Sequence, residues 1–244
     1  MPNIKLVIQY DGTDYSGWQK QPSMVSIQET IEDAIFKVTG EKVNLIGAGR
    51  TDKGVHAQGQ VANFITNSNI PADRFKYAIN SNLPEDIRII ESEQVHDSFH
   101  SRYDAKGKKY TYTIFNGKIL NPIYRRYSYH VPYELNLNDM NQAAKYFLGT
   151  HDFSAFMSSN SSVKSTIRTL YHVELKKDGD LIYVSLQGNG FLYNMVRIIV
   201  GTLVEVGTGK LTPSSIVHII ESKDRKKAGH TAPAKGLCLE KVYY

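Results

Sequence analysis

Hydrophobic and polar residues alternate from Ile4 to Tyr10, which is the pattern of a strand buried on one face only. Ser26 and Glu29 then stand three positions apart as a capping box, and apolar residues recur at helical spacing from there to Val38. Further strands are predicted at 43–46, 60–66 and 87–95, and a second helix at about 72–82. The first half of the chain therefore has the predicted order β-α-β-β-α-β.

The second half of the chain repeats this order. Strands are predicted at 109–115, 170–176, 181–187 and 237–242, and helices at 137–148 and 191–206. Two such halves indicate an α+β fold of two ferredoxin-like (RRM-like) units, 1–104 and 105–244, whose sheets join around a central active-site cleft. A single larger mixed sheet is the alternative.

The composition is that of a globular protein with a proper core: 244 residues, of which 41% are hydrophobic and 22% are charged. Lys and Arg number 29 against 24 Asp and Glu, which leaves a net charge of +5 and favours an anionic partner. The lone cysteine, Cys238, excludes an internal disulfide and fits a reducing compartment. Because the N-terminus enters a strand directly and no apolar run is long enough to span a bilayer, we expect a cytoplasmic protein without a membrane partner.

Three glycines in the segment 47–57 surround charged side chains, in a place where chain entropy disfavours glycine. Arg50 and Asp52 lie two positions apart, so that on an extended backbone they project to the same side. A neighbouring guanidinium favours the ionised carboxylate, which suits a nucleophile or a base that acts at neutral pH. The alternative is a surface glycine turn with an incidental ion pair. The spacing matches neither of the phosphate-binding glycine motifs, so we expect no nucleotide cofactor.

Lysines and tyrosines interleave at strand spacing in the segment 106–112, which places Tyr110 on the same face as the tyrosine two positions on. Aromatic rings beside cations hold unstacked bases and neutralise phosphates. Lys108, Lys109 and, in the glycine segment, Lys53 are therefore candidate RNA-binding residues. Packing of the tyrosines across strands on a solvated sheet is the alternative interpretation.

Arg197 interrupts an apolar run, with two apolar residues before it and three after it. A charge in such a run needs a partner, and either a carboxylate such as Asp52 or a purely structural salt bridge would serve. The 8 histidines show no H-E-x-x-H spacing, and no metal site is expected.

Seven motifs together carry a resemblance to a known family. They lie, in chain order, at 10–19, 49–57, 99–103, 109–112, 149–156, 191–197 and 228–237. In their order and spacing they resemble the family of bacterial tRNA pseudouridine synthases A over nearly the whole chain. Ser101 and Ile198 stand where that family commonly has alanine and asparagine.

The resemblance implies isomerisation of uridine to pseudouridine at positions 38–40 of the tRNA anticodon arm, without a cofactor or an essential metal. It implies that Asp52 is the essential aspartate of the family and Tyr110 its active-site tyrosine. It further implies that Arg50 and Arg197 are the two arginines around that aspartate. The implied assembly is a homodimer that grips the anticodon stem-loop and the body of the tRNA across both subunits.

Two questions stay open at this level. Asp52 is either the nucleophile on the sugar or the base ring, or the base that removes a ribose proton to give a glycal. A non-catalytic RNA-binding protein would explain the basic and aromatic segments but not an Arg-Thr-Asp sequence within the glycine segment. A synthase that modifies another RNA, such as ribosomal RNA, would keep the same catalytic residues.

Overall fold

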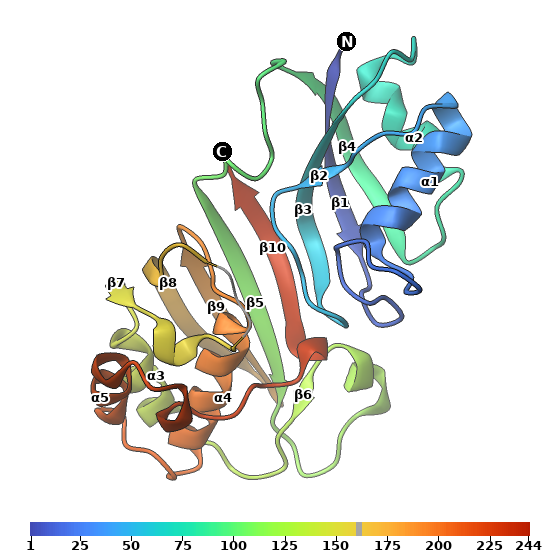
Figure 1. Ribbon diagram of the computed structural model, residues 1–244. Helices are drawn as coiled ribbons and strands as arrows, with labels where there is room; N and C mark the ends of the chain where they lie inside the picture. The colour runs from blue at the N-terminus through green and yellow to red at the C-terminus, as the bar shows by residue number, and fades with distance from the viewer. Residues whose placement is uncertain (160–162) are drawn as a thin grey trace. The chain divides into compact units, whose positions relative to one another are not determined.

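The computed structural model describes residues 1–159 and 163–244, and the chain folds as two α+β units. Residues 1–106 and 238–244 form the first unit, and residues 107–237 form the second. Each unit is a mostly antiparallel sheet with helices packed against it (Figure 1).

β1 (Asn3–Tyr10) lies inside the sheet of the first unit, because both of its edges are paired. It pairs antiparallel with β3 (His56–Ile65) on one side and with β4 (Ile87–Val95) on the other. β2 (Ile46–Gly47) also pairs antiparallel with β3, so that of the predicted strand at 43–46 only the last residue is in a strand. β10 (Leu237–Tyr243) pairs in parallel with β3.

α1 (Ile27–Thr39) begins at the predicted capping box and ends one residue beyond Val38, the last residue of the predicted helical pattern. The Ser26 side chain accepts a hydrogen bond from the Glu29 amide, which satisfies one of the free amides of the first turn. Gly40 ends the helix in the left-handed conformation with a φ of 74°, and its amide donates to the Phe36 carbonyl.

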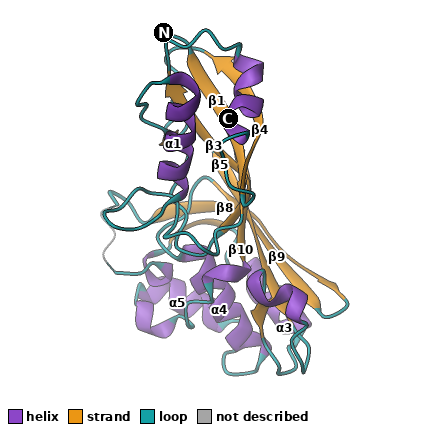
Figure 2. Ribbon diagram, turned by 90° about the vertical axis from the view of Figure 1, so that its right-hand side faces the viewer, coloured by secondary structure: helices purple, strands orange, loops and turns teal. Residues whose placement is uncertain are grey.

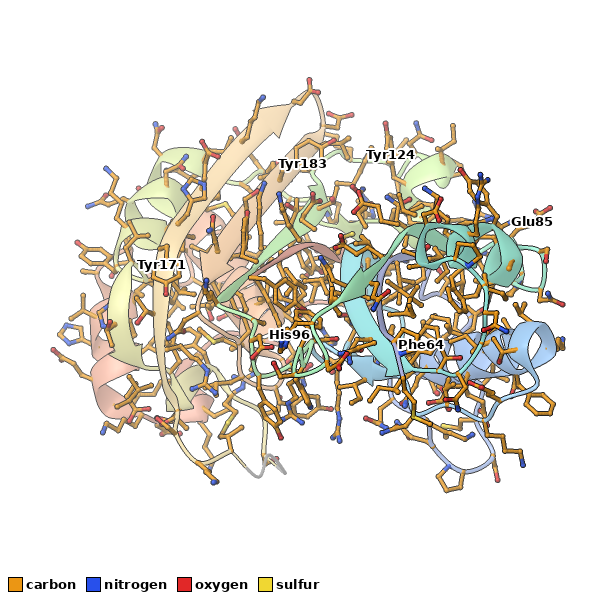
Figure 3. The ribbon with its side chains drawn as sticks, turned by 90° about the horizontal axis from the view of Figure 1, so that it is seen from above. Phe64, Glu85, His96, Tyr124, Tyr171 and Tyr183 are labelled. Atoms are coloured by element: carbon orange, nitrogen blue, oxygen red, sulfur yellow. The ribbon has the colours of Figure 1, made fainter. Side chains whose placement is uncertain are left out.

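α2 (Phe75–Asn80) follows a 3₁₀ turn at Ala72–Arg74 and is shorter than the predicted helix at 72–82. It contacts both α1 and β4, and Figure 1 shows the two helices on the same face of the sheet. On that face Phe64 of β3, marked in Figure 3, meets Phe75 edge to face with ring centroids 5.6 Å apart. The core of the first unit therefore lies between this sheet face and the two helices.

The sheet of the second unit has the strand order β5-β9-β8-β7, with every pair along it antiparallel. The strands are β5 (Gly107–Phe115), β7 (Gly149–Asp152), β8 (Ile167–Asp178) and β9 (Leu181–Gly188), and the short β6 (Tyr129–His130) pairs in parallel with β5. Ile182, Val184 and Leu186 of β9 are fully buried. Tyr183 between them is half-buried and Tyr171 of β8 is exposed; Figure 3 marks both. One face of this sheet is thus the core face.

Three α-helices and four 3₁₀ turns accompany this sheet among the described residues. They are α3 (Leu137–Lys145), α4 (Met195–Gly207), α5 (Ser215–Ser222), and the turns Pro122–Arg126, Ser154–Phe156, Arg225–Lys227 and Ala234–Gly236. α3 and α4 pack against each other and contact β8 and β5 respectively (Figure 2). α4 begins later than the predicted 191 because Asn194 takes a left-handed φ of 61°.

The predicted division assigns all of 105–244 to the second unit, whereas the structure groups residues 105–106 and 238–244 with the first unit. Cys238 of β10 pairs with His56 of β3, and the Lys106 amide donates to the Tyr243 carbonyl. The alternation of a strand predicts its faces but not its partner, which explains the difference. Within the described part of the chain, every helix is too short or too polar to cross a membrane.

Candidate active site

The segment 47–57 runs from the last residue of β2 into the start of β3 and is held by the chain that follows β1. The Trp18 amide donates to the Thr51 carbonyl at 3.0 Å, and Gly17 pairs with Asp52 in an isolated antiparallel bridge. At the other end the Ala48 amide donates to the Val61 carbonyl at 2.7 Å. The backbone on both sides of Asp52 is therefore fixed by main-chain hydrogen bonds.

Two glycines make this arrangement possible. Gly17 has a φ of +110°, and a Cβ there would lie 2.6 Å from the Thr51 carbonyl oxygen, so that only glycine fits. The Val55 amide donates to the Asp52 carbonyl at 3.1 Å, which closes a four-residue turn. Gly54 occupies the third position of this turn with a φ of 76°, a position at which type II turns require glycine.

Exposure differs from residue to residue along the segment. Arg50 is exposed, Thr51 is 7% exposed, Asp52 is half-buried and Lys53 is exposed. Arg50 Nε donates to Gln19 Oε1 at 3.1 Å, which ties the guanidinium to the chain after β1. Thr51 is thus the one buried residue between the exposed Arg50 and the half-buried Asp52.

His56 links the start of β3 to the chain after β1. Its Nδ1 lies 3.1 Å from the Gly12 amide nitrogen and 3.1 Å from Asp11 Oδ1, and its side chain is 9% exposed. The Asp11 carboxylate in turn accepts from the Thr13 amide at 2.9 Å. Polar contacts thus join the segments 10–19 and 47–57. The spacing of the two motifs in the sequence does not predict that they meet.

In the second unit, Tyr110 lies on β5 and is 8% exposed. Its ring meets the ring of Phe191 edge to face, with centroids 5.1 Å apart and an interplanar angle of 83°. Lys108 and Lys109 precede it on the same strand and are half-buried. The structure therefore places three of the predicted site residues on one strand.

Arg197 lies in the first turn of α4, and its guanidinium is tied to two neighbouring groups. Nε donates to the Ala232 carbonyl at 2.8 Å, and a terminal nitrogen donates to Asn194 Oδ1 at 2.7 Å. The Ala232 amide donates back to the Arg197 carbonyl at 3.1 Å. Arg197 thus fastens the segment 228–237 to the start of α4.

Tyr112 adds a second link to the same segment, because its hydroxyl donates to the Pro233 carbonyl at 2.7 Å. Burial raises the pKa of Tyr112 far above its usual value, and the positive charge of Arg197 offsets part of that rise. The Arg197 charge therefore acts on the buried side of β5.

The predicted site residues fall into two groups. Arg50, Asp52 and Lys53 share one segment of the first unit, and Lys108, Lys109, Tyr110 and Arg197 belong to the second. Sequence reasoning missed Asn194, whose left-handed backbone and amide hold Arg197. Asparagine adopts the left-handed conformation more readily than most residues, and this preference is the signal in the sequence that could have pointed to Asn194. Across the described chain, no three His, Cys, Asp or Glu side chains gather in a way that would hold a metal ion.

A sequence model of the tRNA pseudouridine synthase family matches residues 6–104 and 143–244. The chain belongs to this family. The match includes Arg50, Asp52, Lys53 and Arg197, while Tyr110 lies between the two matched ranges. As a member of the family, the protein is an isomerase that converts uridine in RNA to pseudouridine.

Close relatives extend over the full chain. The chain is 58% identical to tRNA pseudouridine synthase A of Acetivibrio thermocellus, with 100% of both chains covered. It is 55% identical to the protein of that name from Thermoanaerobacter sp. and 53% identical to that of Clostridium acetobutylicum, again with 100% of both chains covered.

Two solved structures resemble the fold distantly. A chain of the archaeal box H/ACA sRNP Nop10–Cbf5 complex has a TM-score of 0.38 and 13% identity, covering 96% of this chain and 46% of that chain. A chain of a Cbf5–Nop10–Gar1 complex has a TM-score of 0.38 and 12% identity, covering 96% of this chain and 57% of that chain.

Proposed function

We propose that this synthase isomerises uridines at positions 38–40 in the anticodon stem-loop of tRNA, with Asp52 as its essential catalytic residue. The observation that carries the proposal is the local structure of the segment 47–57, which lies within the range that the family model matches. There a half-buried carboxylate follows a buried threonine and stands at the first position of a tight turn, on a backbone anchored at both ends. Relatives named tRNA pseudouridine synthase A over their full length support tRNA as the substrate.

The reaction rearranges one nucleoside and needs no oxidant or reductant. The bond between N1 of uracil and C1′ of ribose breaks, the base rotates, and a bond forms between C5 and C1′. The C5 proton leaves and N1 takes up a proton, so that atoms and electrons balance. Asp52 acts either as the nucleophile on the sugar or base ring, or as the base that removes a ribose proton.

The other predicted residues assist on the same uridine. The cationic Arg50 favours the ionised form of Asp52 and fills the space that the flipped base vacates. Tyr110, braced edge to face by Phe191, stacks on the uracil and helps to remove the C5 proton. Arg197 completes the electrostatic surroundings of the carboxylate, with its orientation set by Ala232 and Asn194.

We assign RNA-phosphate contacts to Lys53, Lys108 and Lys109. Lys53 is exposed at the turn after Asp52, and the other two precede Tyr110 on β5. Ammonium groups beside an aromatic ring suit a nucleotide that has left its stack. Tyr110 is then a contact residue for the RNA as well as a catalytic one.

The finer fold assignment belongs to the same proposal. The first unit runs β1-α1-β2-β3-α2-β4 along the chain, and β1 lies between β3 and β4. This order is that of a ferredoxin-like unit, and we propose that both halves of the chain derive from it. We place the enzyme in the cytoplasm, where tRNA is its partner.

A homodimer is the proposed assembly, because a net charge of +5 per chain neutralises few of the phosphates of a tRNA. Two chains double that charge and reach the tRNA body as well as the anticodon stem-loop. Light scattering at micromolar concentration is expected to show a dimer. A monomer with full activity would contradict this part of the proposal.

Tritium release from tRNA labelled at uridine C5 tests the function directly. The purified protein is expected to release tritium from whole tRNA, to leave ribosomal RNA unchanged, and to act less efficiently on an isolated anticodon hairpin. Carbodiimide modification followed by primer extension then maps the product, which we expect at positions 38–40. Pseudouridine at other positions, or in ribosomal RNA alone, would overturn the substrate assignment while leaving the isomerase activity intact.

A further inference from the structure

The side-chain hydrogen bonds next to Asp52 lead into the interior of the first unit. Thr51 is 7% exposed, and its Oγ1 lies 2.8 Å from the hydroxyl oxygen of Tyr10. Two residues earlier, the Gly49 carbonyl accepts from Nε2 of Gln60 at 2.9 Å. Tyr10 is 4% exposed and Gln60 is fully buried, so that the Tyr10–Thr51 bond is shielded from water and the Gln60–Gly49 bond is partly shielded.

Tyr10 and Gln60 both belong to strands of the sheet. Tyr10 is the last residue of β1, and Gln60 lies within β3, which pairs antiparallel with β1. The Tyr10 ring also packs against Trp18, with centroids 6.1 Å apart. Because Trp18 holds the Thr51 carbonyl through its amide, Thr51 is fixed by its backbone and by its side chain.

The Tyr10 hydroxyl stays neutral throughout the working range of an enzyme. Burial raises the pKa of Tyr10 well above its usual value, and hydrogen bonding with Thr51 and Gln60 offsets part of that rise. The hydroxyl therefore forms the same hydrogen bond with Thr51 at every pH at which RNA is handled.

We propose that Tyr10 is a positioning residue of the isomerisation, which through Thr51 sets the direction in which the Asp52 carboxylate leaves the backbone. Adjacent residues on extended backbone point to opposite sides, so that holding Thr51 inward turns Asp52 outward. Misplacing a reacting group by about 1 Å costs on the order of a hundredfold in rate. The inference rests on the proposed catalytic role of Asp52.

The chain offers a matched control in Tyr15. This tyrosine is 5% exposed, and its hydroxyl donates to Asp86 Oδ1 at 2.7 Å. Tyr15→Phe therefore removes a buried hydroxyl and its hydrogen bond from the same unit, as Tyr10→Phe does, but the lost bond leads to Asp86 and not to Thr51. A purely structural role of Tyr10 predicts the same phenotype for both variants.

The experiment measures kcat and KM by tritium release from C5-labelled tRNA, together with tRNA affinity and the unfolding midpoint. Tyr10→Phe is expected to lower kcat by about tenfold to a hundredfold at every pH from 6 to 9, with KM and tRNA affinity within about threefold. Tyr15→Phe is expected to keep kcat within about twofold of the wild type, even if its unfolding midpoint falls as far as that of Tyr10→Phe.

Thr51 supplies the second arm. Thr51→Ser keeps the hydroxyl and is expected to keep most of kcat, whereas Thr51→Val removes it and is expected to match Tyr10→Phe. The double variant Tyr10→Phe/Thr51→Val is expected to be no slower than the slower single variant, because both changes break one hydrogen bond. Equal kcat for Tyr10→Phe and Tyr15→Phe, or fully multiplicative losses in the double variant, would overturn the inference. A wild-type protein that releases no tritium from any RNA would instead refute the proposed function.

Discussion

Asp52 and Arg197 are both candidate catalytic residues, and the two units hold them in different ways. In the segment around Asp52, structural hydrogen bonds are made by Thr51, through its side chain and carbonyl, and by the carbonyls of Gly49 and Asp52. In α4 the Arg197 guanidinium itself makes them, to the Ala232 carbonyl and to Asn194. In the first unit, residues that flank the candidate catalytic carboxylate contribute to stability. In the second unit, the Arg197 side chain is both the candidate catalytic group and a structural one.

This contrast predicts which substitutions separate activity from stability. Where neighbours carry the framework, the functional group can be changed with little effect on the fold. Where the functional group is part of the framework, its removal leaves buried polar atoms without partners, at a cost of about 1–3 kcal/mol. The following variants test the contrast, from the largest expected effect to the smallest.

Asp52→Asn is expected to abolish turnover, because an amide is neither a nucleophile nor a base at neutral pH. Affinity for tRNA is expected to stay within about tenfold, since phosphate and stacking contacts are spread over a large surface. Urea unfolding is expected to change by less than about 1 kcal/mol. Asp97→Asn, which alters an exposed aspartate of the same unit, serves as the control and should keep full activity. Pseudouridine formation by Asp52→Asn above background would remove Asp52 from the catalytic role.

Tyr110→Phe keeps the ring that meets Phe191 and removes only the hydroxyl. We expect a rate loss of about a hundredfold if that hydroxyl moves the C5 proton, with tRNA affinity nearly unchanged. Tyr110→Ala also removes the stacking ring, so its affinity should fall further than that of Tyr110→Phe. Equal affinities of the two variants would show that the ring does not stack on the base.

Arg197→Ala is expected to lower both activity and stability, in contrast to Asp52→Asn. The Ala232 carbonyl and Asn194 side chain lose their donor, and the free energy of unfolding should fall by about 2 kcal/mol. Arg197→Lys keeps the charge but not the forked geometry, so it should recover part of the activity and little of the stability. Chemical denaturation combined with single-turnover rates separates the two effects. Full activity in Arg197→Ala would leave this residue with a structural role only.

Asp152 provides the opposite case, a carboxylate whose own bonds are structural. Hydrogen bonding from Thr166 and Lys223 lowers the pKa of Asp152 from 3.8 to about 2. Because the folded-state pKa lies below the unfolded value, the stabilisation is present above about pH 4 and is lost as the pH falls towards 2.

Asp152→Asn should therefore lose about 1 kcal/mol at pH 7, and its difference from the wild type should shrink below pH 4. Its rate of pseudouridine formation at neutral pH should stay normal. Urea denaturation at pH 7 and at pH 3 measures the stability difference. A difference that stays constant between these two values would contradict the assigned structural role.

Local signals in the sequence account for the best predicted elements. α1 begins at the capping box of Ser26 and ends at Gly40, because caps and glycine conformations depend on the residues themselves. The alternation of β1 and β9 likewise gave their buried faces. The helix predicted from residue 191 was less accurate, since Asn194 is left-handed and α4 begins only at Met195; the Asn194 amide donates to Ser158, from a distant part of the chain.

The candidate site divides in the same way. The sequence alone determined that Asp52 stands in a glycine-rich segment beside Arg50, and that Arg197 interrupts an apolar run, because these are properties of residue order. Only the tertiary structure decided that β10 pairs with β3, that Tyr10 holds Thr51, and that Arg197 bonds the Ala232 carbonyl. Each of these contacts joins residues at least 35 positions apart, and the free energy that selects them comes from burial and hydrogen bonding in the assembled core, which no local pattern encodes.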